Sequence, residues 1–341
     1  MRKVFVKAVL IFVSIVLSLI LKTLPVFSAE FTMKCGTPGS PTDSISTMAK
    51  WVVKEVSKRT GGRIEGRVFP ASQLGNNIQM IEQLQLGTLE CTAGAVAFLS
   101  GAYPPITIFD LPFFFPENAA LVRKVLKDGK TARWLLDDMG RVGLKGMALH
   151  LSGYKQFTAN KSITKLEDMK GIKFRAMASP ILLEQFKALG ANAIPISFAE
   201  TYGALQSGVA EGQENPYWAI YKMKFYEVQK YLSISNHGLI VIDTLVSKKW
   251  WDKLPSDLQK TLREVFREAE RVTWERGQEI DKKAVKAMKA AGLKFVKISP
   301  QERKRFRDAT RNVKNVYIKR IGKDGKNLVQ MLEADLAAHS K

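Results

Sequence analysis

A cation on an apolar strand and a cluster of acids and amides mark residues 171–216 of this 341-residue chain. Arg175 lies in the run IKFRA at 172–176, and the alternation of side chains along a strand places it on the face opposite Phe174. The run EGQENP at 211–216 closes the stretch. A guanidinium presents a planar fork of N–H donors that matches both oxygens of a carboxylate. This combination favours a pocket that grips a carboxylate over a catalytic site.

Arg175 needs a partner, because an unpaired buried charge is costly. The residue types leave two kinds of partner open: an internal acid such as Glu214 or Glu200, or the carboxylate of a ligand. Residue type alone favours the internal acid. Asn215 is held in an extended backbone by Pro216. Its amide either hydrogen-bonds a ligand oxygen or satisfies a loop carbonyl.

A helix is expected between these two runs. Ser197 and Glu200 have the spacing of a capping box, which predicts a helix over 198–207 that ends at Gly208. Phe198, in the first turn, either points into a cleft or packs in the core.

A second aromatic segment, YPPITIFDLPFFFP, occupies residues 103–116. Its four prolines exclude a regular helix or a central strand, and its four phenylalanines argue against a solvated loop. The segment is either a loop packed over the core or an apolar wall of a pocket. Phe114 is our candidate for that wall.

Other residues with reactive side chains are scattered. Cys35 and Cys91 each lie in a short strand-like run, so that a disulfide and two buried thiols both stay open. The three histidines, at 150, 237 and 339, form no cluster with cysteine that would suggest zinc. The sequence contains no nucleophile–base arrangement and no phosphate loop, so we expect no catalysis, no cofactor and no metal.

Strand-like and helix-like runs alternate along the chain, which predicts an α/β fold with largely parallel sheets. Strands are expected at 31–35, 63–69, 91–95 and 143–150, and helices at 44–57, 76–86 and within 117–139. The length exceeds what one hydrophobic core usually supports, so two lobes are expected. The chain is predicted to cross between them near 152–158 and 236–247.

Residues 256–291 predict one long helix, with Ser256 and Gln259 as its capping box. Apolar residues recur at helical spacing and no proline interrupts them, although Gly277 weakens the middle. An unbroken helix of this length would measure about 54 Å. It either bends at Gly277 or spans both lobes.

The first 29 residues read as a targeting segment, with a basic start, an apolar run over 8–21 and a cleavage site near 28–29. The apolar run is shorter than the roughly 20 residues that span a bilayer. The chain carries a formal charge of +21, and removing the four cations of this segment leaves +17. Export argues against a nucleic-acid partner. The scattered cations instead bias the field towards anions.

The order and spacing of 171–216 resemble those of the solute-binding proteins of TRAP (tripartite ATP-independent periplasmic) transporters, DctP type. Within that stretch the matching runs are GIKFR at 171–175, ALGA at 188–191, PISFAETYGALQSG at 195–208 and AEGQENP at 210–216. Further matching runs are FPASQLGN at 69–76, DLPFFF at 110–115, KFYEVQKYLSISNH at 224–237 and KLPSDLQK at 253–260. The resemblance extends from about residue 31 to the C-terminal region.

The resemblance implies that Arg175 grips the substrate carboxylate, that Asn215 supports this contact and that Phe198 lines the pocket. Lys155 stands where the sialic-acid-binding branch of the family has a second arginine, and a lysine keeps the charge but loses the fork. Residues 93–96 read AGAV where that branch has an acid, which argues against a sialic acid as ligand.

Three further residues are candidates for the pocket. Tyr217 and Trp218 follow Asn215 closely, and they either form an aromatic side of the pocket or pack in the core. His237 is either close to the cleft or a hydrogen-bonded core histidine.

The resemblance implies a two-lobed periplasmic-binding-protein fold, each lobe a mostly parallel sheet flanked by helices, with the long helix spanning both. We expect residues 1–29 as signal peptide, 30–152 and 241–280 as lobe I, and 153–240 and 281–341 as lobe II. The expected protein is a monomeric periplasmic receptor that delivers an organic acid to TRAP permease subunits. The alternatives are an exported sensor, or an enzyme with Arg175 as clamp and Glu214 or His237 as base.

Overall fold

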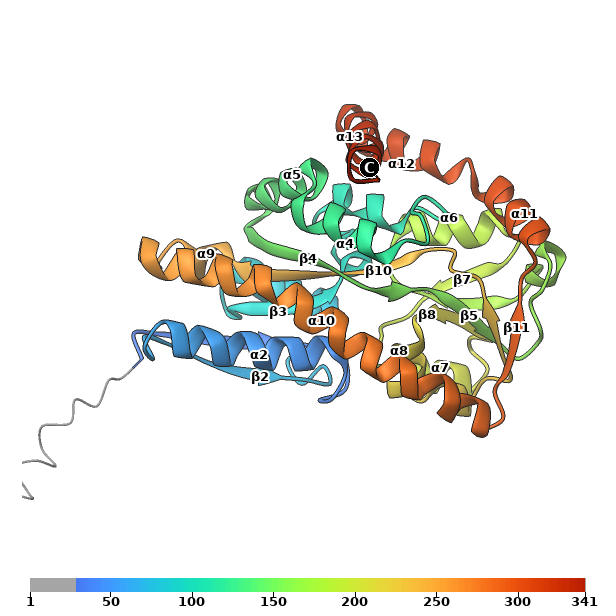
Figure 1. Ribbon diagram of the computed structural model, residues 1–341, viewed down its shortest axis with the longest axis horizontal. Coiled ribbons are helices and arrows are strands. Elements are labelled where there is room, and N and C mark those ends of the chain that lie inside the picture. Colours follow the sequence, from blue (N-terminus) through green and yellow to red (C-terminus); the bar gives the residue numbers. More distant parts are fainter. Residues whose placement is uncertain (1–28, 341) are drawn as a thin grey trace, which may run out of the picture.

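The computed structural model describes residues 29–340 (Figure 1). The predicted signal peptide lies almost wholly outside these residues. None of the helices formed by residues 29–340 combines the length and the apolar composition that crossing a membrane requires.

The first sheet has the strand order β2-β1-β3-β10-β4. Its strands are β1 Phe31–Gly36, β2 Ile64–Phe69, β3 Cys91–Ala95, β4 Leu144–Tyr154 and β10 Leu239–Ser247. Only β10 runs against its neighbours β3 and β4. Every residue of β10 is buried, as expected for a strand covered on both faces. Cys35 and Cys91 are register partners on β1 and β3, and both are free, buried thiols.

The second sheet has the order β11-β9-β5-β8-β6-β7. Its strands are β5 Gln156–Ala159, β6 Lys173–Ala176, β7 Asn192–Pro195, β8 Gly212–Asn215, β9 Tyr231–Ile234 and β11 Lys294–Lys297. Here β5 alone is antiparallel to its neighbours β8 and β9. Two mostly parallel sheets flanked by helices confirm the predicted fold class.

The helices that border the two sheets follow the predicted positions closely where a local cap defines their start. They are α2 Ser44–Arg59, α3 Asn77–Leu86, α4 Ala119–Asp128, α5 Lys130–Asp138, α6 Pro180–Ala188, α7 Thr201–Gln206, α8 Tyr217–Lys222, α9 Lys248–Trp251, α10 Ser256–Ala290, α11 Pro300–Thr310, α12 Val313–Ile321 and α13 Lys323–His339. Asp43 caps α2, and Asn76 with Gln79 forms a capping box on α3. Helix α7 begins three residues later than 198, because Ser197 and Glu200 bond each other in the preceding turn.

Helix α10 is unbroken over 35 residues and confirms the long helix of the prediction. It packs against α2 and β4 on one side of the molecule and against α8 on the other (Figure 1). The predicted capping box at its start is wrong. Pro255 is the N-cap, and the Gln259 amide instead donates to the carbonyls of Trp251 and Leu254, both at 3.1 Å.

The proline-rich segment at 103–116 packs over the core. It opens with a 3-10 helix over Pro104–Asp110, whose prolines occupy the first turn, where a missing N–H has no helical partner to lose. Phe109 and Phe115 are buried in the core, and Phe114 packs edge-on against Phe115.

Three connections join the sheets: β4 to β5, β9 to β10, and the path through α9 and α10 from β10 to β11. The Lys155 amide donates to the Gly238 carbonyl at 2.8 Å, so the first two crossings are bonded to each other. Gly153 has a φ of +144°, and a Cβ there would lie 2.9 Å from Pro216 Cβ, which explains the glycine.

Helix α13 lies over α4 and α5, whereas α11 and α12 pack against α6 (Figure 1). Asp335 on α13 accepts hydrogen bonds from the backbone amides of Lys130 at 3.1 Å and Thr131 at 2.8 Å. Helix α13, which we expected in lobe II, therefore packs against the helices of lobe I. The exact lobe boundaries stay a prediction.

Candidate ligand-binding site

Arg175 on β6 is a fully buried cation with unused donors. Its Nε donates to the Ile196 carbonyl at 3.0 Å, whereas Nη1 and Nη2 have no hydrogen-bond partner within residues 29–340. Burial lowers the pKa of Arg175 to about 10, so the guanidinium stays charged at neutral pH. The guanidinium carbon lies 6.0 Å from the ring centroid of Phe98.

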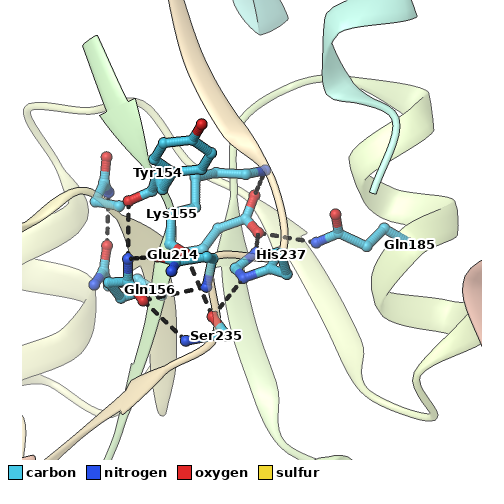
Figure 2. Close-up of polar contacts among 10 residues, drawn as sticks. Tyr154, Lys155, Gln156, Gln185, Glu214, Ser235 and His237 are labelled. Carbon is cyan, nitrogen blue, oxygen red and sulfur yellow. Dashed lines mark hydrogen bonds and ion pairs between the residues drawn. The ribbon is translucent and has the colours of Figure 1, made fainter. Parts of the chain in front are cut away.

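Neither of the internal acids considered for Arg175 bonds to it. Glu200 is exposed and accepts the Ser197 hydroxyl at 2.7 Å. Glu214 is fully buried, and Lys155 Nζ lies 2.6 Å from its Oε1 (Figure 2). His237 Nε2 contacts its Oε2 at 2.6 Å, and Gln185 Nε2 donates to the same oxygen at 2.9 Å. Lys155 therefore neutralises Glu214 and leaves Arg175 without a counter-ion.

The protonation states around Glu214 follow from its partners. Burial alone would raise the pKa of Glu214, but the charge of Lys155 and the bond from His237 hold that pKa well below its usual range. Burial lowers the pKa of His237 to about 4, so the ring is neutral. It donates from Nε2 to Glu214 and accepts the Ser235 hydroxyl at Nδ1, 2.7 Å away. Its ring stacks on Phe157 with centroids 3.8 Å apart. These polar groups are satisfied by one another.

A narrow cavity of about 20 Å³ lies between the two sheets. Its lining consists of Pro38, Ile45, Asn77, Ala95, Phe98, Met177, Phe198, Asn215, Trp218, Ile240 and Ile242. Ala95 and Asn215 end strands β3 and β8, so the cavity occupies the carboxyl edge of both sheets, where α/β folds bind ligands. Ile45 and Asn77 lie in the first turns of α2 and α3, whose dipoles favour an anion there.

The lobes meet around this cavity. The Ser100 hydroxyl donates to the Ala178 carbonyl at 2.5 Å, and the Ser179 hydroxyl donates to Asp110 Oδ2 at 2.6 Å. Ser100 follows β3 and Asp110 ends the 3-10 helix, whereas Ala178 and Ser179 both follow β6. The structure is therefore a closed arrangement of the two lobes.

A wider groove of about 240 Å³ lies on the outer surface beside α4, α5 and α10, away from Arg175. Its acids are already paired, Glu270 with Arg123 at 2.6 Å and Asp137 with Lys145 at 3.5 Å. We place the candidate site in the narrower cavity, because one of its lining residues, Phe98, also borders the buried guanidinium of Arg175, whose carbon lies 6.0 Å from the Phe98 ring centroid.

The structure brings together Asn215, Phe198 and Trp218 on the cavity wall. Arg175 is not one of the lining residues and adjoins this wall at Phe98. Asn215 Nδ2 donates to Gln213 Oε1 at 2.6 Å, and Trp218 Nε1 donates to the Ser152 carbonyl at 2.8 Å.

The other four candidates, like Arg175, are not among the residues that line the cavity. Lys155 and His237 belong to the buried network of Glu214 (Figure 2). Tyr217 stacks on Phe295 at 6.2 Å, and Phe114 packs against Phe115 at 5.5 Å. Ligand contact by these four stays a prediction.

Several lining residues were missed from the sequence, among them Asn77, Phe98, Met177, Ile240 and Ile242. Their positions carry a signal that is visible in retrospect. Phe98 and Met177 directly follow predicted strands, and Asn77 follows a capped helix start, which are the places where an α/β fold forms its binding crevice.

Comparisons with known proteins agree with this geometry. The family model described as bacterial extracellular solute-binding protein, family 7 (DctP) matches residues 36–320. The C4-dicarboxylate-binding periplasmic protein DctP of Vibrio cholerae is 35% identical over 299 residues, which cover 86% of this chain and 86% of that protein. Two crystal structures of TRAP periplasmic solute-binding proteins are also similar. The one from Desulfovibrio salexigens, with bound orotic acid, has a TM-score of 0.87 at 38% identity and covers 90% of this chain and 99% of its own. The one from Sulfurospirillum deleyianum, with bound succinate, has a TM-score of 0.82 at 32% identity, with the same coverage of 90% and 99%.

The family match spans most of the chain, and the fold and the position of the cavity agree with a receptor that closes around a solute. The similar proteins are solute-binding receptors and not enzymes. This chain belongs to family 7 of the bacterial extracellular solute-binding proteins, the DctP family of TRAP transporter receptors.

Proposed function

We propose that this protein captures an organic acid between its two sheets and delivers it to the membrane permease of a TRAP transporter. The observation that carries the proposal is Arg175, whose two Nη atoms are buried and lack partners among residues 29–340. A buried cation is unfavourable unless an anion reaches it. The relatives support the chemical class, since orotic acid and succinate, the ligands of two of them, are carboxylates.

Capture depends on closure of the lobes. Arg175 and Asn215 belong to the second sheet, whereas Asn77 and Phe98 follow strands of the first. A carboxylate held by Arg175 touches both sets of residues only when the lobes close. Closure also removes water, which strengthens the ion pair. The ligand therefore favours the closed form, and the permease distinguishes a loaded receptor from an empty one by its shape.

The geometry gives little support to acid–base catalysis. A catalytic base must come within hydrogen-bond reach of a substrate proton. Glu214 and His237, the two candidate bases, are bonded to each other and to Lys155, and neither lines the cavity. We therefore propose a receptor that binds its ligand without chemical change. An exported sensor would bind its ligand in the same way and would differ from a transporter receptor only in its membrane partner.

Calorimetric titration with a panel of carboxylates tests the binding proposal. We expect at least one acid to bind the wild type and the Arg175→Met variant to lose that binding. Arg271→Met is the matched control, since Arg271 is exposed on α10 and pairs only with Glu275. Unchanged affinity in the Arg175→Met variant would overturn the assigned role of Arg175.

The transport partner is tested separately. Purified receptor, loaded with a radiolabelled acid, is added to vesicles that contain the TRAP permease subunits of the same organism. We expect uptake only when receptor, ligand and permease are all present. Uptake that is independent of the receptor would contradict delivery.

We further propose that the mature protein is a monomer exported to the periplasm. The exposed large apolar side chains of the described residues, Ile78, Leu86 and Val209, are few and separate in sequence, whereas a stable dimer needs a continuous apolar interface. Light scattering after gel filtration measures the oligomeric state. Mass spectrometry of the N-terminus of periplasmic protein checks cleavage near residues 28–29.

A further inference from the structure

We propose that the ligand is a small monocarboxylate with a mainly apolar body, and neither a dicarboxylate nor a sugar acid. This inference rests on the proposed function, because it concerns the same cavity. It follows from which charges are already used, from the composition of the lining, and from the size of the space.

Only one cation is available for an anionic ligand. Arg175 has two unpaired Nη atoms, whereas Lys155, the second cation in the region, is held by Glu214 at 2.6 Å. None of the described side chains that line the cavity is charged. A second carboxylate on the ligand would therefore lose its water at closure without gaining a counter-ion, which strongly disfavours a dicarboxylate.

The lining also offers few hydrogen-bond partners. Nine of its eleven side chains are apolar, and the two polar ones are Asn77 and Asn215. Asn215 already uses its Nδ2 on Gln213. Each ring hydroxyl of a sugar acid would need a partner in the closed cavity, and unpaired buried hydroxyls are unfavourable. A site built this way rejects polyhydroxylated ligands and tolerates one additional polar group at most.

Apolar and aromatic surfaces complete the enclosure. Phe98, Phe198 and Trp218 come from three different segments, and Phe98 also borders the Arg175 guanidinium. Such surfaces bind a ligand body that gains by leaving water, through burial and through contacts with the rings. The cavity of about 20 Å³ is far below the usual size of a ligand pocket, so a small acid requires the least separation of its walls.

Two matched pairs of acids test the inference by calorimetry on the purified mature protein. Cyclohexanecarboxylate and galacturonate both place a carboxylate on a six-membered ring, but only the second carries ring hydroxyls. Benzoate and terephthalate differ by one carboxylate. We expect the apolar monocarboxylate of each pair to bind at least tenfold more tightly.

The outcomes separate this inference from the proposed function. Equal or tighter binding of galacturonate or terephthalate, lost in the Arg175→Met variant, would overturn the apolar ligand and leave the carboxylate receptor standing. Failure of all four acids, and of orotate and succinate, to bind at millimolar concentration would overturn both.

Lining variants provide an independent check. Ile242→Thr replaces the ethyl branch by a shorter hydroxyl, and Ala95→Ser adds one hydroxyl at a second position, in case the first variant fails to fold. We expect each to reduce the preference for cyclohexanecarboxylate over galacturonate at least threefold. Ile78→Thr makes the same change as Ile242→Thr on an exposed side chain and should leave the preference unaltered. A preference that stays unchanged in both folded lining variants would contradict the inference.

Discussion

Arg175 gives the ligand-free protein a desolvated charge that its Nε bond to Ile196 and the more distant charge of Glu214 compensate only in part. Arg175→Met keeps most of the side-chain length and removes the charge. We expect the variant to increase the free energy of unfolding of ligand-free protein by about 1–4 kcal/mol, while carboxylate binding is lost. Urea unfolding and calorimetry measure the two effects. A variant less stable than the wild type would mean that Arg175 has an internal partner and serves the fold.

Glu214 has the opposite role, because its removal leaves a buried cation. Glu214→Gln deprives Lys155 Nζ of the oxygen 2.6 Å away, and we expect a loss of about 3–5 kcal/mol in the free energy of unfolding. The double variant Lys155→Met, Glu214→Gln removes both charges and should recover most of this loss. Urea unfolding of the singles and the double completes the cycle. Additive losses in the double variant would show that the two side chains do not interact.

The residue types alone favoured an internal acid as the partner of Arg175, and the family resemblance pointed instead to a ligand carboxylate. Neither could predict the charge pairing around Glu214. The contact between Lys155 and Glu214 joins residues 59 positions apart, across the antiparallel strands β5 and β8. No local pattern predicts that register, so the sequence left Lys155 as a candidate ligand contact and Glu214 as a candidate partner of Arg175.

At the scale of elements, one helix is stabilised at its start by another far along the chain. Helix α5 has glycine at its N-cap, and Asp335 of α13 accepts its first two amides instead. Asp335→Ala should lower the free energy of unfolding by about 0.5–2 kcal/mol, the usual cost of a lost cap. Glu333→Ala, on the same helix but half-exposed, should change it by less than about 0.5 kcal/mol. Equal effects of the two variants in urea unfolding would contradict the capping role.

Elements with local signals were predictable, and elements fixed by tertiary contacts were not. The helix expected over 76–86 begins one residue later, at Asn77, and helical periodicity identified α10 over its full length. The cap at the start of α10 was misassigned because Gln259 bonds loop carbonyls that only the folded chain brings near it. The contact of α13 with α5 was missed for the same reason.

At the scale of the whole molecule, length predicted two lobes, but the contacts that hold them together appear only in the structure. Asp110 lies at such a contact, where it accepts the Ser179 hydroxyl at 2.6 Å. Burial raises the pKa of Asp110 to about 7, and the charge of Lys155 only partly opposes this. Opening of the lobes would hydrate Asp110 and return its pKa towards about 4. Closure therefore takes up a proton.

The sign of the resulting pH dependence follows directly. The pKa of Asp110 is raised in the closed form, so protonation of Asp110 favours closure. This favourable free energy is full below about pH 4 and is lost as the pH rises through about 7. We expect ligand affinity, measured by calorimetry between pH 5.5 and 8 where a carboxylate ligand stays ionised, to fall by up to about tenfold per pH unit below 7 and to level off above it.

Two asparagine variants separate closure from general stability. Asp110→Asn cannot ionise, so its affinity should be flat across this range. Asp243 is the matched control, since burial raises its pKa to about 8, yet it lies within the first sheet on β10, opposite Gly94. In the wild type, the raised pKa of Asp243 should make folding stability fall as the pH rises from about 4 to 8, and Asp243→Asn should remove this fall. The dependence of ligand affinity on pH should stay unchanged in this variant. A flat wild-type binding profile, or an undiminished slope in Asp110→Asn, would mean that Asp110 stays buried when the lobes part.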